Sequence, residues 1–273
     1  MTILLRIGLT PLAYALVAKA QARFGDWIGG RLIGLPVTTG PFLLTVCLTA
    51  SRATAAHAAA GVTTGQMAVV VFCGAYAWLA RRLDPLRATV ASLVLALTAV
   101  LGLSSFSGAW TAAAAVWAVI IVSLLLWPWA PQPLAAGTDT SADTATDTRA
   151  PILTRAVIST CVVATMSTLV PILGARPAGV LSSAPVLLSI ILPSTHRSSG
   201  AAGAAAVARG TIVSMAATVA FSAVLATTLP HMAVAPALLL AAGVLAALLL
   251  TTPLVDRALA QAGSALGRPE AVL

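Results

Sequence analysis

Charged side chains are scarce in this sequence. Only 8% of its 273 residues are Asp, Glu, Lys or Arg, whereas 59% are hydrophobic. A water-soluble globular domain carries about 25% charged residues, so this composition excludes a soluble fold. The mean hydropathy of +1.01 instead predicts an all-α protein that crosses the lipid bilayer several times.

The sequence also has few aromatic residues, 5% of the chain, and three cysteines. Helices poor in aromatic side chains and rich in alanine are expected to pack closely through small side chains. The cysteines are dispersed in apolar runs and lack the spacing of a metal site or a disulfide framework; they are Cys47, Cys73 and Cys161. We therefore expect no redox chemistry and no bound metal.

Acidic residues are missing from every predicted span. Asp26, Asp84 and Asp256 flank spans, and the other acidic residues lie in a polar linker or near the end of the chain. A carboxylate relay for protons or cations therefore has no obvious carrier. The sequence also has no nucleophile motif, His-Glu metal pair, Walker sequence or catalytic carboxylate pair. These absences predict a protein that is not an enzyme and has no cofactor.

One stretch within a hydrophobic span occurs twice. Residues 34–41 (Gly-Leu-Pro-Val-Thr-Thr-Gly-Pro) return in altered form as residues 179–185 (Gly-Val-Leu-Ser-Ser-Ala-Pro). At an offset of 144, residues 38–46 align with residues 182–190 in chemical character at nearly every position. This match indicates a duplication, and it divides the chain into two related halves.

Each copy has the composition of a helix start, with a hydroxyl pair, a small residue, a proline and then an aliphatic run. A helix starting at Pro41 and ending near Ala50 covers about ten residues, or roughly half the hydrocarbon core. We therefore predict a broken, discontinuous helix in each half, within spans 27–50 and 174–193.

The remaining spans give two transmembrane repeats. Residues 1–130 form the first repeat, with predicted helices at 1–22, 58–80, 88–103 and 110–127 beside the broken span. Residues 131–150, rich in Thr and Asp, predict a disordered cytoplasmic linker. Residues 151–252 form the second repeat, with helices at 153–173, 211–229 and 233–250, and residues 253–273 form a cytoplasmic tail. The alternative for residues 1–22 is a cleaved signal peptide with an Ala-Gln-Ala site.

Nine helices, five plus four, have a topological consequence. An odd number in the first copy makes the second enter the membrane from the opposite side, which produces an inverted-topology repeat. With the N-terminus outside, twelve basic residues face the cytoplasm and three, Arg6, Arg52 and Arg176, face outward, as the positive-inside rule requires. The net charge of +8 is therefore attributed to topology, and no nucleic-acid partner is expected.

The predicted site lies where the two broken helices converge near the bilayer centre. Their unpaired N–H groups and positive dipole ends favour an anionic or strongly polar group. The predicted substrate-binding residues are Thr38, Thr39, Gly40, Pro41, Ser182, Ser183, Ala184 and Pro185. The alternative is purely structural, because Ser, Thr, Pro and Gly also kink and pack ordinary membrane helices.

Other polar residues are weaker candidates. Arg52 and Arg197 follow the two broken helices and could attract an anion at either mouth, or simply mark helix ends. His57, His196 and His231 are predicted to lie in loops. Gln66, an amide within a span, could line a cavity or serve interhelical packing.

The sequence thus favours a multi-pass secondary transporter or exporter of a small polar or anionic solute in the bacterial inner membrane. Its C-terminus is expected in the cytoplasm. A non-transporting assembly factor or permease-like subunit is the second hypothesis, and a membrane enzyme acting on lipid-linked substrates is the third. The expected partners are the lipid bilayer and the solute; a homo-oligomer or a partner subunit is left open.

Overall fold

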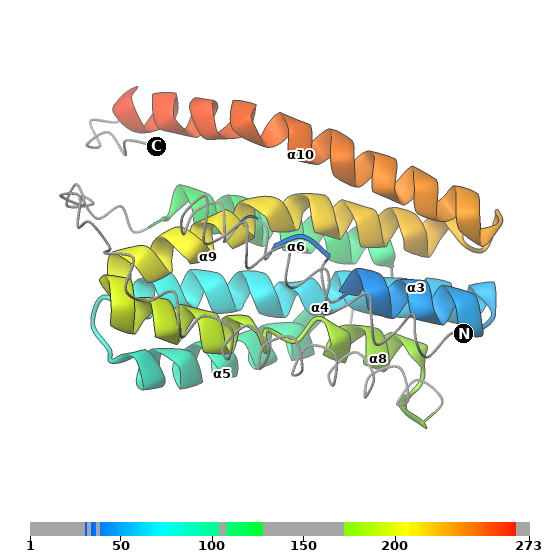
Figure 1. Ribbon diagram of the computed structural model, residues 1–273, viewed down its shortest axis with the longest axis horizontal. Coiled ribbons are helices and arrows are strands. Elements are labelled where there is room, and N and C mark those ends of the chain that lie inside the picture. The colour runs from blue at the N-terminus through cyan, green and yellow to red at the C-terminus, as the bar shows by residue number, and fades with distance from the viewer. Residues whose placement is uncertain (1–30, 32–33, 37–38, 104–107, 128–171, 266–273) are drawn as a thin grey trace, which may run out of the picture.

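The computed structural model describes residues 31, 34–36, 39–103, 108–127 and 172–265, and the regular secondary structure among these residues is helical, with no β-strand (Figure 1). In chain order the helices are α3 (Thr39–Thr49), α4 (Arg52–Leu79), α5 (Pro85–Leu103), α6 (Ala109–Leu125), α8 (Ala175–Ser182), α9 (Leu188–Thr228) and α10 (Val234–Ala265). The all-α expectation is therefore confirmed for the described part of the chain.

Four of these helices are long and apolar enough to cross a membrane, namely α4, α5, α9 and the 234–251 part of α10. Large apolar side chains cover the outer helices, and Leu239 and Leu250 of α10 are 74% and 79% exposed. Exposure of this kind suits contact with lipid. The helices thus indicate a membrane-embedded protein.

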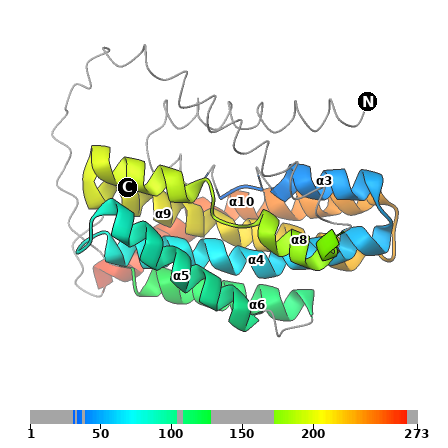
Figure 2. The ribbon, with the colours of Figure 1, turned by 90° about the horizontal axis from the view of Figure 1, so that it is seen from below.

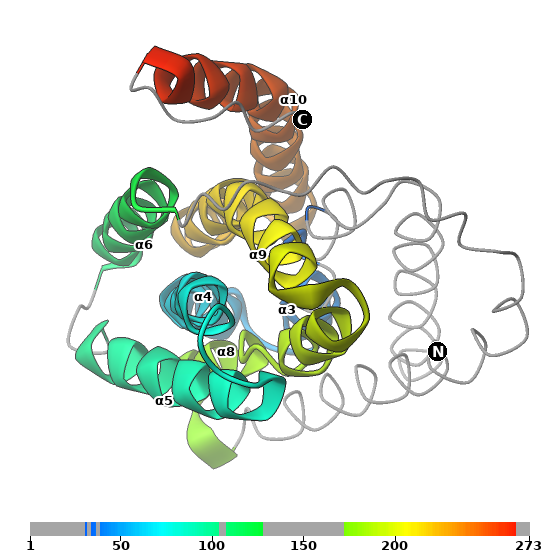
Figure 3. The same ribbon diagram turned by 90° about the vertical axis from the view of Figure 1, so that its left-hand side faces the viewer.

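The centre of the molecule is formed by α4 and α9. Viewed end-on, α3, α5, α6 and α8 surround this pair, and α10 lies at the periphery beside α9 (Figure 3). The view from below also places α5 and α6 along one side of α4 (Figure 2). The two core clusters contain fully buried side chains of both central helices, among them Phe72 and Ile212 in one and Val62 and Leu225 in the other.

Helix α9 consists of two segments joined at Gly200. This residue has φ 74° and ψ −177°, a backbone conformation that only glycine adopts readily. The first segment, 188–199, includes Pro193, and the second covers 201–228. The predicted boundaries at 193 and 211 are therefore wrong. Ile191 and Leu192 are buried, and their packing retains the helix although Pro193 cannot donate a backbone hydrogen bond.

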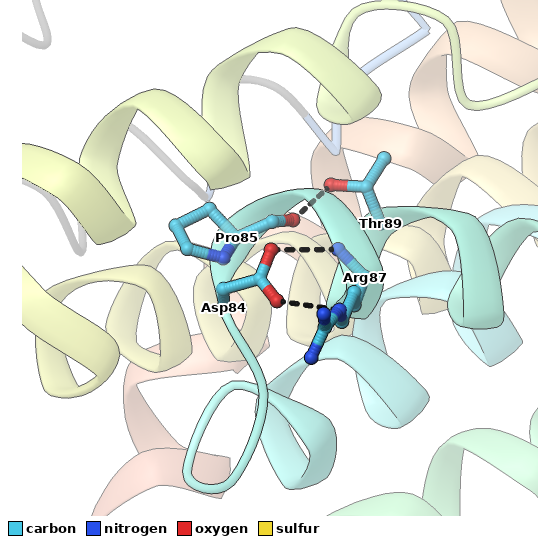
Figure 4. Close-up of polar contacts among 4 residues, drawn as sticks. All are labelled: Asp84, Pro85, Arg87 and Thr89. Carbon is cyan, nitrogen blue, oxygen red and sulfur yellow. Dashed lines mark hydrogen bonds and ion pairs between the residues drawn. The ribbon is translucent and has the colours of Figure 1, made fainter.

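The turn between α4 and α5 is closed by Asp84. Its Oδ2 accepts a hydrogen bond of 3.2 Å from the backbone N–H of Arg87, and its Oδ1 lies 3.2 Å from Nε of that residue (Figure 4). Pro85 opens α5, where a missing N–H is tolerated, and its carbonyl accepts from the Thr89 hydroxyl at 2.7 Å. Helix α5 therefore begins at Pro85, within the predicted charged turn, rather than at residue 88.

Several predictions concern segments outside the described residues. They are the first span or signal peptide at 1–22, most of 27–38, the linker at 131–150, nearly all of the 153–173 helix, and residues 266–273. In the described part, α10 continues past residue 252 to Ala265.

Candidate functional site

The second copy of the repeated stretch lies between two helices. Helix α8 ends at Ser182 and α9 begins at Leu188, so residues 183–187, including Ala184 and Pro185, are not helical. A helix starting at Pro185 was predicted, and the observed start is three residues later. The Ser182 hydroxyl donates to the carbonyl of Gly179 at 2.7 Å, and the Ser183 hydroxyl lies 3.3 Å from the carbonyl of Val62.

The first copy precedes and begins α3. Residues 34–36 form a turn and a bend, α3 starts at Thr39, and the backbone N–H of Gly40 donates to the carbonyl of Pro36 at 2.8 Å. Pro41 lies in the first turn, where it removes no intrahelical bond. Thr39 is buried, whereas Thr38 lies outside the described residues.

Glycines bring α8 against α4. A Cβ atom added at Gly61 would overlap the carbonyl oxygen of Arg176, and one added at Gly179 would overlap the carbonyl oxygen of Ala58. At Gly65 it would lie 2.5 Å from the Val180 oxygen. The two backbones therefore touch, which is the close approach that small residues allow between membrane helices.

Gly34 makes the corresponding contact with α9. A Cβ atom there would lie 2.6 Å from the carbonyl oxygen of Thr211 and 2.8 Å from the Cβ of Ser214. The hydroxyl of Thr218 donates to the Gly34 carbonyl at 2.7 Å. The turn before α3 is thus held by α9 as α8 is held by α4.

The two copies of the repeated stretch lie about halfway along the long helices. Gly65, which contacts Ser183, is at the middle of α4, and Ser214, which contacts Gly34, is at the middle of the second segment of α9. These two helices are antiparallel, since Arg52 at the start of α4 lies beside Met232 just beyond α9. From this level α3 runs toward the end where α4 begins, and 188–199 runs toward the opposite end (Figure 1).

A buried polar chain links α4 and α9 at the same level. The Thr63 and Ser222 hydroxyls are 2.9 Å apart. The Nε2 of Gln66 lies 3.4 Å from the Thr218 carbonyl and 3.5 Å from the Ser222 hydroxyl. Gln66 is among the residues that the sequence singles out, whereas Thr63, Thr218 and Ser222 are not. The spacing of four between the last two, which places both on one helix face, was the available signal.

The proposed mouth residues lie at opposite ends. Arg52 Nη1 donates to the Met232 carbonyl at 3.3 Å, whereas Arg197 follows His196, whose Nδ1 is 3.3 Å from the Tyr76 hydroxyl near the end of α4. His57 and His196 lie within α4 and α9, so their prediction as loop residues is wrong. His231 lies in the turn after α9.

Within the described ranges, no three His, Cys, Asp or Glu side chains gather as a metal site would require. No protein-family model, curated protein or solved structure matches the chain.

Proposed function

We propose that the chain is a secondary transporter or exporter of a small polar or anionic solute, held between two interrupted helices at the centre of the membrane. The observation that carries this proposal is that the two copies of the repeated stretch lie near the middle of the two central helices, with Ser183 against Gly65 and Gly34 against Ser214. Discontinuous helices meeting at mid-depth are the usual substrate site of transporters built from inverted repeats.

Two relationships support an inverted repeat. Gly34 and Gly179, which open the two copies of the repeated stretch, each bring the backbone against one of the two antiparallel central helices. The helical segments that follow them, α3 and 188–199, run toward opposite ends of the molecule (Figure 1). A two-fold relation in the membrane plane would produce both features.

The chemistry of the proposed chamber favours an anion or a strongly polar group. The first N–H groups of a helix have no intrahelical acceptor, and the helix dipole adds partial positive charge there. The starts of α3 and of 188–199 would both contribute this charge. Thr39 and Ser183, both buried, would add hydroxyls.

The arrangement of basic residues supports the proposed orientation in a bacterial inner membrane. Arg81, Arg82 and Arg87 lie around the α4–α5 turn, and Arg197 is at the same end beside the Tyr76–His196 pair. Arg52 lies at the other end. Under the positive-inside rule, the end with more arginines faces the cytoplasm; the N-terminus is then outside and the C-terminus inside.

A second candidate function is a non-transporting assembly factor or permease-like subunit. The hydroxyl of Ser182 donates to the Gly179 carbonyl, and that of Ser183 lies near the Val62 carbonyl, so both can act purely in packing. The exposed leucines of α5 and α10 would then contact another membrane protein.

Flux through the isolated chain distinguishes these functions. The purified protein, reconstituted in proteoliposomes, is expected to take up at least one of radiolabelled lactate, glycine and inorganic phosphate above protein-free vesicles. Absence of flux, together with co-purification of a stoichiometric membrane partner, would support the second function and contradict transport.

A further inference from the structure

Gln66 is a side-chain amide buried in α4, with 1% of its surface exposed. Its oxygen, Oε1, has no hydrogen-bond partner among the described residues. The contacts of its nitrogen, 3.4 Å to the Thr218 carbonyl and 3.5 Å to the Ser222 hydroxyl, are longer than an ordinary hydrogen bond. The amide is therefore held in place but poorly satisfied.

The neighbours of Gln66 fix which atom remains unpaired. A carbonyl oxygen only accepts hydrogen bonds, so the amide nitrogen rather than its oxygen must face Thr218. The same Thr218 donates its hydroxyl to Gly34, which connects the amide to the turn before α3. Gln66 also directly follows Gly65, the residue against Ser183. The Gln66 amide thus lies at the level of both copies of the repeated stretch.

Burying an acceptor without a donor is unfavourable, and this cost is recovered when a donor arrives. We propose that Oε1 of Gln66 accepts a hydrogen bond from the solute, and that the solute is a small carboxylate with an N–H or O–H group beside the carboxylate. This inference rests on the proposed function, which supplies the electropositive helix starts for the carboxylate. Gln66 adds the requirement that the solute carries a hydrogen-bond donor.

Two probe pairs isolate the donor. N,N-dimethylglycine and glycine betaine share their charges and differ by one methyl group, which replaces the last N–H. In the second pair, 2-methoxypropanoate carries a methyl group in place of the hydroxyl hydrogen of lactate. Calorimetry on the detergent-purified full chain is expected to show about tenfold tighter binding of the donor-bearing member of one pair. The pair that discriminates identifies an amino or a hydroxy acid.

The variant Gln66→Met keeps an unbranched side chain of similar volume and removes the amide acceptor. It is expected to bind both members of the discriminating pair equally. Ser92→Ala is the matched control, because Ser92 Oγ in α5 is the other buried atom without a partner in the described part; this variant should keep the tenfold ratio.

The inference is overturned if the wild-type chain binds both members of each pair equally, binds none of the four probes, or keeps its ratio in Gln66→Met. The affinities of the wild-type chain for the two members of each pair test the inference even if Gln66→Met does not fold. Flux of the same probes in proteoliposomes is measured separately. Binding with the expected ratio but without flux would refute transport alone, whereas flux that is insensitive to the donor would refute only the role of Gln66.

Discussion

Gly65 in α4 lies directly against Ser183, the first residue after α8. A Cβ atom at Gly65 would be 2.9 Å from the Cβ of Ser183, closer than two side chains can approach. The missing side chain therefore sets how near the interrupted segment comes to α4. One turn earlier, Gly61 has the same relationship to the backbone of Arg176.

The glycine contact predicts a position-specific loss of stability. In Gly61→Ala the added methyl meets the backbone oxygen of Arg176, which cannot move unless α8 moves. We expect destabilisation of about 1–3 kcal/mol, measured as a lower melting temperature in detergent. Gly243→Ala in α10 is the control, since nothing lies within 4 Å of its added Cβ. Equal melting temperatures for the two variants would contradict the contact.

The buried hydroxyls predict a loss of transport without a loss of insertion. Thr39→Val keeps the side-chain shape and Ser183→Ala adds no bulk, and each variant removes a hydroxyl from the proposed chamber. We expect uptake in proteoliposomes to fall by roughly tenfold or more, as for the loss of a buried hydrogen bond of about 1.5 kcal/mol. Thr98→Val removes an exposed hydroxyl that bonds within α5, and this control should retain uptake. Wild-type uptake in both site variants would argue for the packing role.

Local signals in the sequence located much of the described fold. Pro41 and the hydroxyl residue Thr39 lie in the first turn of α3, and the second copy coincides with the interruption after Ser182. These features depend on a few neighbouring residues, because proline and hydroxyl side chains act on their own backbone. The pattern therefore placed these helix starts to within three residues, since α3 begins at Thr39 instead of Pro41 and α9 at Leu188 instead of Pro185.

Features that depend on distant residues were not predictable in the same way. The predicted spans end at 193 and resume at 211, but Ala204, Val207 and Ala208 are buried, and this packing sustains the helix between them. The contact of Gln66 with Thr218 joins positions 152 residues apart. No local pattern specifies such a partner, so this part of the site required the structure.

The prolines predict a conformational effect distinct from that of the hydroxyls. Pro185 has no N–H and disfavours helix in the residue before it, so Pro185→Leu should allow α8 and 188–199 to join more readily. Uptake is expected to fall, and hydrogen exchange at 183–187 should slow as new backbone bonds form. Pro41→Leu should reduce uptake likewise. Pro193→Leu, within an existing helix, is the control; unchanged exchange in Pro185→Leu would show that Pro185 does not maintain the interruption.

The basic residues predict which end of the molecule faces outward. Cys47 and Cys73 are buried, and replacing all three native cysteines by alanine provides a background for single labels. Ala53→Cys near Arg52 and Arg82→Cys in the α4–α5 turn are at exposed positions and at opposite ends of α4. A membrane-impermeant maleimide is expected to label position 53 in intact spheroplasts and position 82 only after permeabilisation, because arginine-rich ends remain in the cytoplasm. The reverse order would invert the proposed topology, and labelling of both positions in intact spheroplasts would exclude α4 as a membrane span.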